Sequence, residues 1–229
     1  MAIFCGLITI ILFFNRYRIS KSILVFLLNK TIPNMNKMIL NKEVIYEHIE
    51  RYKFRFKSSF YIKVVGDEPI NCHSENLKWT AGFISNIQPI KNNQKIEYDK
   101  NPATYNYIDK QKFSIIFPND MKLSKNDKPY KTGFKITELN DDKHVSKPIL
   151  VVGVYDVTKE LTLKVYFNEN LNPIYPRGLK YAHFIDDIPY DTVALNKQYD
   201  DEKNMHYVEF YVKTPIYGGK YAIDWSFND

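Results

Sequence analysis

Apolar and polar residues alternate along much of the chain from residue 35 onward, and aromatic residues occupy many of the apolar positions. Phe54 and Phe56, for example, alternate with Lys53, Arg55 and Lys57. A period of two places the aromatic side chains on one face of a strand and the charged side chains on the other. The pattern predicts a strand with one face toward solvent.

Eight later segments have the length and the apolar content of strands, and residues typical of turns (Asn, Asp and Pro) lie between them. They are Leu77–Ser85, Lys112–Phe117, Thr132–Leu139, Pro148–Val157, Leu161–Phe167, Leu179–Ile185, Met205–Lys213 and Lys220–Phe227. No long helical pattern separates them, which disfavours parallel βαβ units. The sequence therefore predicts an all-β fold, mainly an antiparallel sandwich or a barrel-like sheet.

Two short connections predict hairpins. Asp156–Glu160 joins two of these strands over a hairpin-length gap, and Gly218 with Gly219 supplies the positive φ of a tight turn between the last two. Two longer polar stretches, Ile87–Asp109 and Tyr190–Lys203, read as loops, and the first is alternatively a weak edge hairpin.

One short N-terminal helix is also predicted. Asn41 is suited to cap it, and Glu43 suits its positive end. Val44, Ile45, His48, Ile49 and Tyr52 then recur at a spacing of three to four residues.

The first 34 residues differ from the rest, because they are apolar and carry four basic residues and no acidic one. The apolar run Ile3–Phe14 has 12 residues, which as a helix cover about 18 Å of a hydrocarbon core about 30 Å thick. A single span that also includes the second run, Ile23–Leu28, would place Arg16 and Arg18 near the bilayer centre, at a cost of about 3 kcal/mol each. We therefore divide the chain into an apolar leader, 1–34, and a β-rich domain, 35–229.

Four interpretations of the leader remain open. It is a short membrane anchor, an interfacial amphipathic segment, a signal peptide, or a stretch outside a protein that starts at Met35 or Met38. As an anchor within residues 1–28, it would place the domain in the cytoplasm, because the basic residues follow the apolar run. The side chains expected to meet the membrane are Ile3, Ile11, Phe13, Phe14, Arg16 and Arg18.

Composition and charge exclude some classes of protein. The chain has 18 Tyr, 8 Gly and a net charge of +6, but removing the four basic residues of the leader leaves 28 basic and 26 acidic residues. A domain so close to neutral lacks the concentrated positive charge typical of nucleic-acid binding. Cys5 and Cys72 do not make a disulfide framework.

The strongest candidate for catalysis is a short cluster of His183, Asp186 and Asp187. If a strand continues through it, His183 and Asp187 share a face, as acid–base chemistry or a hard metal ion would require. The alternative is a turn that ends the strand. No sequence motif for a metal or a cofactor is found.

The aromatic residues favour a different class of function. Tyr and Trp are enriched in protein interfaces, although most of them are expected in the core. The candidates for a binding surface are Trp79, Tyr211, Tyr217, Tyr221 and Trp225. We expect a non-enzymatic, membrane-associated β-rich module that binds another macromolecule, such as an immunity-type or envelope protein. The alternatives are an enzyme that uses the histidine–aspartate cluster and a soluble β-barrel that senses a ligand.

Overall fold

The chain divides into two units, residues 1–35 and 36–229. The computed structural model describes residues 36–50, 53–78, 83–84, 87–98, 110–140, 148–171, 173–183 and 186–227. The expected leader, with its membrane residues Ile3, Ile11, Phe13, Phe14, Arg16 and Arg18, lies outside the described residues. So does Trp79.

The described residues are almost entirely β-structure, which confirms the all-β class. The strands are β1 (Lys37–Glu50), β2 (Lys53–Val64), β3 (Cys72–Lys78), β4 (Phe83–Ile84), β5 (Ile87–Pro89), β6 (Lys95–Tyr98), β7 (Lys110–Ile116), β8 (Tyr130–Asn140), β9 (Ile149–Gly153), β10 (Thr158–Phe167), β11 (Pro173–Tyr181), β12 (Asp191–Ala194), β13 (Lys197–Asp200), β14 (Met205–Lys213) and β15 (Lys220–Phe227). A single turn of 3₁₀ helix spans Pro118–Asp120.

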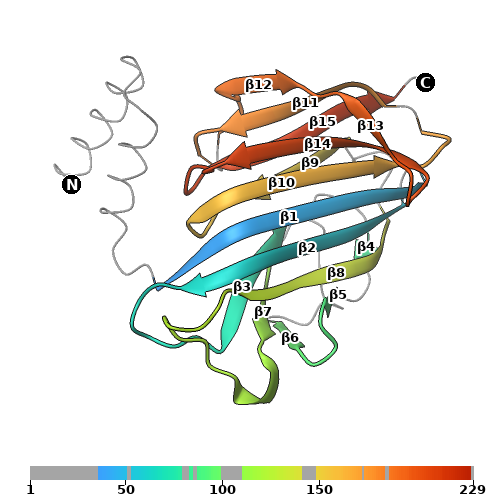
Figure 1. The fold of residues 1–229 in the computed structure, drawn as a ribbon. Coiled ribbons are helices and arrows are strands. Elements are labelled where there is room, and N and C mark those ends of the chain that lie inside the picture. The colour runs from blue at the N-terminus through green and yellow to red at the C-terminus, as the bar shows by residue number, and fades with distance from the viewer. Residues whose placement is uncertain are drawn as a thin grey trace, which may run out of the picture. The chain divides into compact units, whose positions relative to one another are not determined.

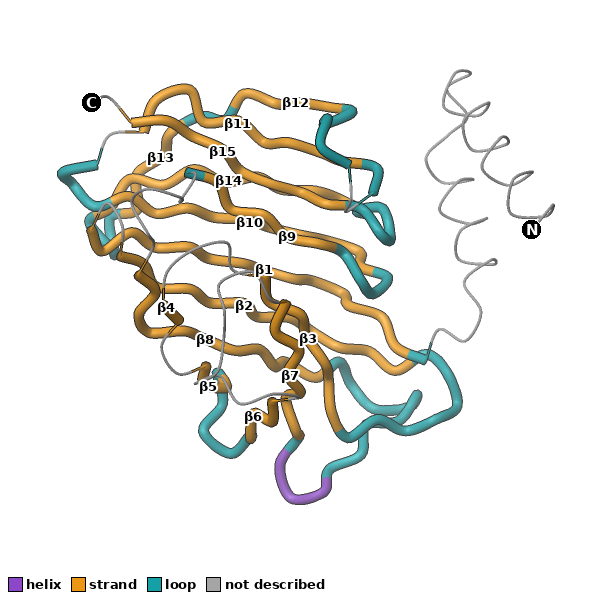
Figure 2. Tube along the Cα trace, turned by 180° about the vertical axis from the view of Figure 1, so that it is seen from behind, coloured by secondary structure: helices purple, strands orange, loops and turns teal. Residues whose placement is uncertain are grey.

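The strands form three sheets (Figures 1 and 2). The eight-stranded sheet has the order β13-β14-β10-β1-β2-β8-β4, with β5 also paired to β8. The four-stranded sheet has the order β12-β11-β15-β9, and the three-stranded sheet has the order β3-β7-β6. Of the strand pairs described, β1 with β10 is parallel and the others are antiparallel.

One hydrophobic core joins the three sheets. It takes alternate side chains from the inner face of the eight-stranded sheet, such as Val44 and Phe60, and packs them with Phe113 of β7 and Ile223 of β15. The inner face is therefore the face with these buried residues. The alternate positions, such as Glu43 and Lys57, form the outer face of the same sheet.

The expected N-terminal helix is wrong, because Asn41 lies within the long strand β1. Val44, Tyr46 and His48 alternate and are buried on the inner face. Ile45 and Ile49, on the other face, added the apolar positions that imitated a helical spacing. Pairing of β1 with both β2 and β10 decides for the strand, because neighbours on two sides satisfy its backbone groups.

Both expected hairpins are also wrong. The Asp156–Glu160 connection leads from β9 in the four-stranded sheet to β10 in the eight-stranded sheet, so these strands do not pair. The turn at Gly218 and Gly219 likewise joins β14 and β15 of different sheets. The positive φ expected in this turn is found at Gly218, at 76°. These short connections are crossings between the layers of the core.

The two polar stretches contain short edge strands. Tyr190–Lys203 includes β12 and β13, which are the edge strands of two different sheets. In Ile87–Asp109, the turn at Asn92 and Asn93 separates β5 from β6, and these strands also pair with different neighbours. Hairpin pairing is therefore absent from the described part of both stretches.

Candidate functional site

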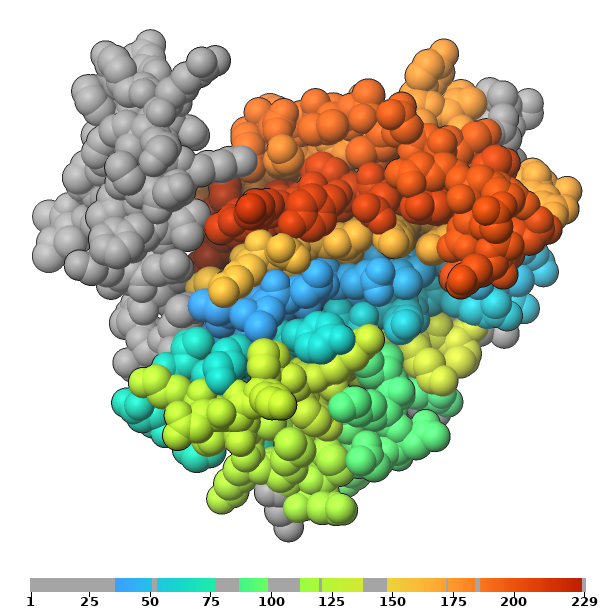
Figure 3. All heavy atoms as spheres, in the orientation of Figure 1, coloured from blue at the N-terminus to red at the C-terminus, as the bar shows by residue number. Residues whose placement is uncertain are grey.

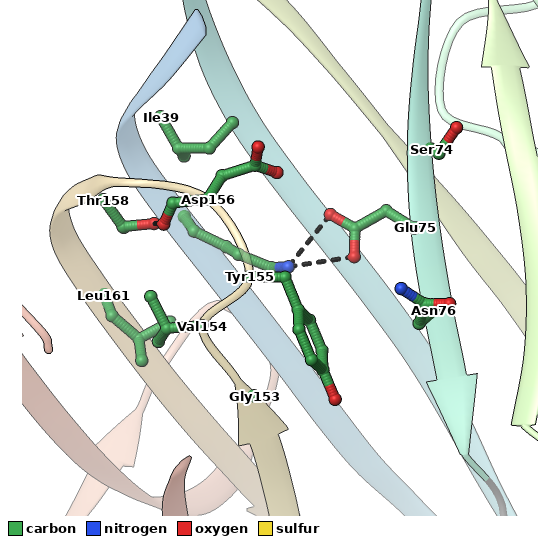
Figure 4. A pocket seen from close by; sticks show the side chains of 11 residues that line it. Ile39, Ser74, Glu75, Asn76, Gly153, Val154, Tyr155, Asp156, Thr158 and Leu161 are labelled. Atoms are coloured by element: carbon green, nitrogen blue, oxygen red, sulfur yellow. Dashed lines mark hydrogen bonds and ion pairs between the residues drawn. The ribbon is translucent and has the colours of Figure 1, made fainter. Parts of the chain in front are cut away.

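A small cleft lies where the edge strand β3 of the three-stranded sheet approaches the end of β9 (Figure 4). β1 and β10 of the eight-stranded sheet contribute Lys42 and Thr158 to its wall, and β3 contributes Glu75. The cleft has a volume of about 20 Å³, which is roughly the space of one water molecule. It is too small for a substrate.

A chain of polar contacts runs beside this cleft and joins three segments. Lys42 on β1 contacts both carboxylate oxygens of Glu75 on β3, at 2.9 and 3.0 Å. Glu75 also accepts a hydrogen bond from Nε2 of His73 at 3.0 Å. Nδ1 of His73 lies 2.8 Å from Lys37 Nζ, and Lys37 lies 3.6 Å from Asp156 in the β9–β10 connection.

The protonation of His73 follows from these partners. A lysine ammonium can only donate, so Nδ1 of His73 accepts and Nε2 carries the hydrogen that Glu75 accepts. Burial lowers the pKa of His73, against the effect of Glu75, and the ring is therefore neutral at neutral pH. Burial alone would raise the pKa of Glu75, but Lys42 and His73 outweigh it and lower this pKa to about 2.

In this contact chain each carboxylate has a cation or a hydrogen-bond donor beside it, because Glu75 contacts Lys42 and His73, and Asp156 contacts Lys37. Each charged residue in the cleft wall, Lys42, Glu75 and Asp156, contacts an oppositely charged residue of the protein. This arrangement ties β1, β3 and the β9–β10 connection together. It does not present a free nucleophile, base or metal ligand, and we interpret it as a structural clamp.

A wider surface basin lies where β1 and β10 end and β14 begins. Its volume is about 370 Å³, and Glu47, Arg55 and Asn168 line it. Glu47 accepts hydrogen bonds from Arg55 at 3.0 Å and from Lys203 at 2.6 Å. Burial opposes a low pKa for Glu47, but Lys203 and Arg55 lower it. The carboxylate is therefore ionised and held by two cations.

His48 lies at the inner edge of this basin and is 2% exposed. Its ring packs among aromatic rings, including Phe54 and Phe167, with centroids 4.5 and 5.2 Å away. Burial lowers its pKa to about 3. The imidazole is therefore a neutral member of the core at physiological pH.

In the predicted cluster, residues 184 and 185 lie outside the described residues, and the backbone N–H of Asp186 donates to the carbonyl of His183 at 3.1 Å, as in a turn. β11 ends at Tyr181, so the strand that would have aligned the side chains does not reach His183. The carboxylate of Asp186 accepts a hydrogen bond from the backbone N–H of His183 at 2.8 Å. Asp187 and His183 are exposed. In the described residues, no three His, Cys, Asp or Glu side chains are grouped as a metal site.

The predicted aromatic residues divide between core and surface. Tyr221 and Trp225 are 1% and 4% exposed, so the expectation that they face a partner is wrong. They lie on the inner side of β15, against the core. Tyr211 and Tyr217 are 49% and 46% exposed.

The outer face of the eight-stranded sheet combines tyrosines with charges of both signs, and Figure 3 shows the bands of β14, β10, β1 and β2 side by side on one surface. Tyr211 lies on β14, and Tyr61 on β2 is 40% exposed. On β10, one of the two strands between them, Lys164 lies 3.0 Å from Glu209 and 3.8 Å from Glu43. Burial opposes a high pKa for Lys164, but these carboxylates raise it.

The buried clamp was not predicted from the sequence. Its residues His73 and Glu75 lie on strand β3, whose first part, up to Asn76, is not among the predicted strands. The available signal was the spacing of His73 and Glu75, which are two residues apart and therefore share one face of a strand.

Cys72 is a free cysteine. Among the described helices, none is long and apolar enough to cross a bilayer.

No protein family matches the chain, and no curated protein resembles it in sequence. Solved structures with a weak likeness include an M1 zinc metallopeptidase from Deinococcus radiodurans, with a TM-score of 0.39, 8% identity and coverage of 83% of this chain and 43% of that chain. Another is aminopeptidase A from Legionella pneumophila, with a TM-score of 0.42, 10% identity and coverage of 85% and 22%. The chain thus spans less than half the length of these proteins. A likeness at these TM-scores establishes neither a shared fold nor a shared activity.

Proposed function

We propose that this protein is a non-enzymatic β-sandwich-like module that binds another protein through the outer face of its eight-stranded sheet. The main observation in support of this proposal is that Tyr61 and Tyr211 are exposed on this face. Tyrosine offers a large contact area at a small cost in conformational entropy, and it is enriched in interfaces. Strands β10 and β1 lie between the two tyrosines, which places them about 14 Å apart across the sheet.

The charges beside the tyrosines fit this role. Lys164 with Glu43 and Glu209 forms an ion-pair network at the surface. Such a network gives a surface specificity for a partner of complementary charge more than it adds raw affinity. A standard protein interface of about 800 Å² per partner is wide enough to contact both tyrosines and this network.

Membrane association is part of the proposal and rests on the sequence of residues 1–28. An anchor of this kind would hold the module at the bilayer, with the cytoplasmic side favoured by the basic residues that follow the apolar run. The partner would then be a protein found at the same membrane. Neither a nucleic acid nor a cofactor is part of this proposal.

The enzymatic alternative, with His183, Asp186 and Asp187, has little support. β11 ends at Tyr181, before His183, so no strand aligns the three side chains on one face, and the Asp186 carboxylate accepts a hydrogen bond from the backbone N–H of His183. The alternative of a β-barrel that senses a ligand would require a pocket of about 300 Å³ or more that encloses most of the ligand. The cleft beside Glu75 is far smaller, at about 20 Å³, and the basin at Glu47, at about 370 Å³, is an open surface depression.

The proposal is tested by the size of the native assembly. The tagged full-length protein, extracted with mild detergent from its own cells, should elute in a complex larger than its chain of 27.1 kDa. The double variant Y61A/Y211A should lose this complex. The control Y175A removes an exposed tyrosine from β11 of the four-stranded sheet and should keep it. Elution of the wild type and both variants at the size of the free chain would refute the proposal.

A further inference from the structure

Lys57 of β2 lies directly opposite Lys135 of β8 on the outer face of the eight-stranded sheet. Both side chains are exposed, and neither has an ion-pair partner among the described residues. Their lateral neighbours in the same row are uncharged: Ile45 on β1 and Gln88 on β5. Like charges directly opposite on a sheet are destabilising. Within the described residues, this repulsive pair therefore has no neutralising partner.

A third lysine of the same face, Lys131, lies on one of the same two strands. Lys131 of β8 is opposite Tyr61 of β2, and its Nζ lies 5.6 Å from the centre of the Tyr61 ring. Ser59 and Gly133 lie between this pair and the lysine pair, and both are buried. These two small residues therefore form the base of a shallow depression between the longer lysine and tyrosine side chains. We call Lys57, Tyr61, Lys131 and Lys135 the β2–β8 strip.

The positively charged area of the β2–β8 strip is narrow. The next strand, β1, presents Glu43 and Glu47 on the same face, and Glu43 is paired across the sheet with Ser59 while Glu47 is paired with Arg55. Two strands are about 10 Å wide. A flat membrane or a nucleic-acid backbone lying on this face would bring its phosphates against these carboxylates, whereas a single extended segment along the strip would not.

We infer that the β2–β8 strip binds an acidic, extended segment of the partner protein, an inference that rests on the proposed function. Carboxylates of the segment would pair with Lys57, Lys131 and Lys135, and an apolar or aromatic side chain would lie on Tyr61. Binding of the segment offsets the repulsion between the two opposed lysines. The interaction should weaken as salt is added, because the charges on both sides are exposed.

The test is a fluorescence anisotropy titration of the full-length protein with a labelled decaglutamate peptide at low salt. The variant K57S/K135S should bind the peptide about tenfold more weakly than the wild type, because it removes two charged contacts. The control K122S/K128S removes the same net charge from exposed positions in the connection between β7 and β8. It should change the affinity by less than about twofold.

Several outcomes would overturn the inference. One is no binding of decaglutamate to the wild type, and another is an equal loss of affinity in both variants. A third is tighter, Lys57-dependent binding of single-stranded DNA or of phosphatidylserine vesicles, which would assign the strip to a nucleic acid or a lipid surface. If K57S/K135S loses peptide binding but keeps the native complex, the strip is not where the partner docks, and the proposed function stands. If the wild type forms no native complex, the proposed function fails even where the peptide binds.

Discussion

Lys42 on β1 and Glu75 on β3 form a two-pronged ion pair at 2.9 and 3.0 Å that joins the eight-stranded sheet to the three-stranded sheet. Both side chains are largely buried, at 13% and 10% exposure. Because both side chains are shielded from solvent, removal of one would leave the charge of the other poorly hydrated. The two sheets share the hydrophobic core, and this pair adds a polar link beside it.

Substitution of Lys42 by Met should therefore lower the free energy of unfolding by about 3–5 kcal/mol, the usual cost of leaving one charge of a buried pair without its partner. The measurement is urea denaturation of the wild type and K42M. The double variant K42M/E75Q should lose less than the sum of the two single variants, because it removes the uncompensated charge.

The matched control for this pair is K95M, because Lys95 and Glu97 form an exposed ion pair. Its effect should stay within about 1 kcal/mol. If K42M were as mild as K95M, the contact between Lys42 and Glu75 would not link the sheets.

Stability should fall as the pH falls below about 6.5. Burial lowers the pKa of His48 to about 3 from 6.5, so the unfolded chain takes up a proton first as the solution is acidified. The folded state then loses stability relative to the unfolded state, by about 2 kcal/mol from this group between pH 7.5 and pH 5. His73 acts in the same direction, because burial also lowers its pKa.

The check is to compare urea denaturation at these two pH values for the wild type and H48L. The variant should lose a smaller part of its stability on acidification, because leucine has no proton to gain. Equal stability of the wild type at both pH values would contradict the burial of neutral His48.

Gly178 on β11 should tolerate no side chain. A Cβ atom at this position would lie 2.7 Å from the ring of Phe210 on β14, closer than real atoms approach. G178A should lower the free energy of unfolding by about 1–3 kcal/mol through overpacking. T192A, at an exposed position of the neighbouring strand β12, is the control and should stay within about 0.5 kcal/mol. A neutral G178A would mean that the two sheets are not packed face to face here.

Strand content followed from the sequence, but strand pairing did not. The alternation at Phe54 and Phe56 was enough to identify β2. Pairing of β1 with β10 joins Val44 to Leu163, more than 100 residues along the chain, and no local pattern encodes such a partner. The short Asp156–Glu160 connection looked like a hairpin, because chain length alone does not distinguish a hairpin from a crossing between layers.

For the aromatic residues, too, the sequence predicted one property and not another. Alternation correctly separates neighbouring positions of a strand onto two faces, but it does not say which face the core covers. Tyr221 and Trp225 are on the covered face of β15, and Tyr211 is on the open face of β14. The clamp at Glu75 could not be predicted either, because a short strand rich in polar residues has the same local sequence pattern as a loop. Only its ion-pair partner, which is distant in the sequence, distinguishes the two.

The most direct test of the proposed interface is photocrosslinking in the cells from which the protein comes. A photoreactive phenylalanine is placed at Tyr61 or Tyr211 on the outer face, or at Thr192 on the four-stranded sheet as the control. We expect one and the same protein adduct from Tyr61 and Tyr211, and none from Thr192. No adduct from the outer face, or the same adducts from all three positions, would contradict the proposed interface.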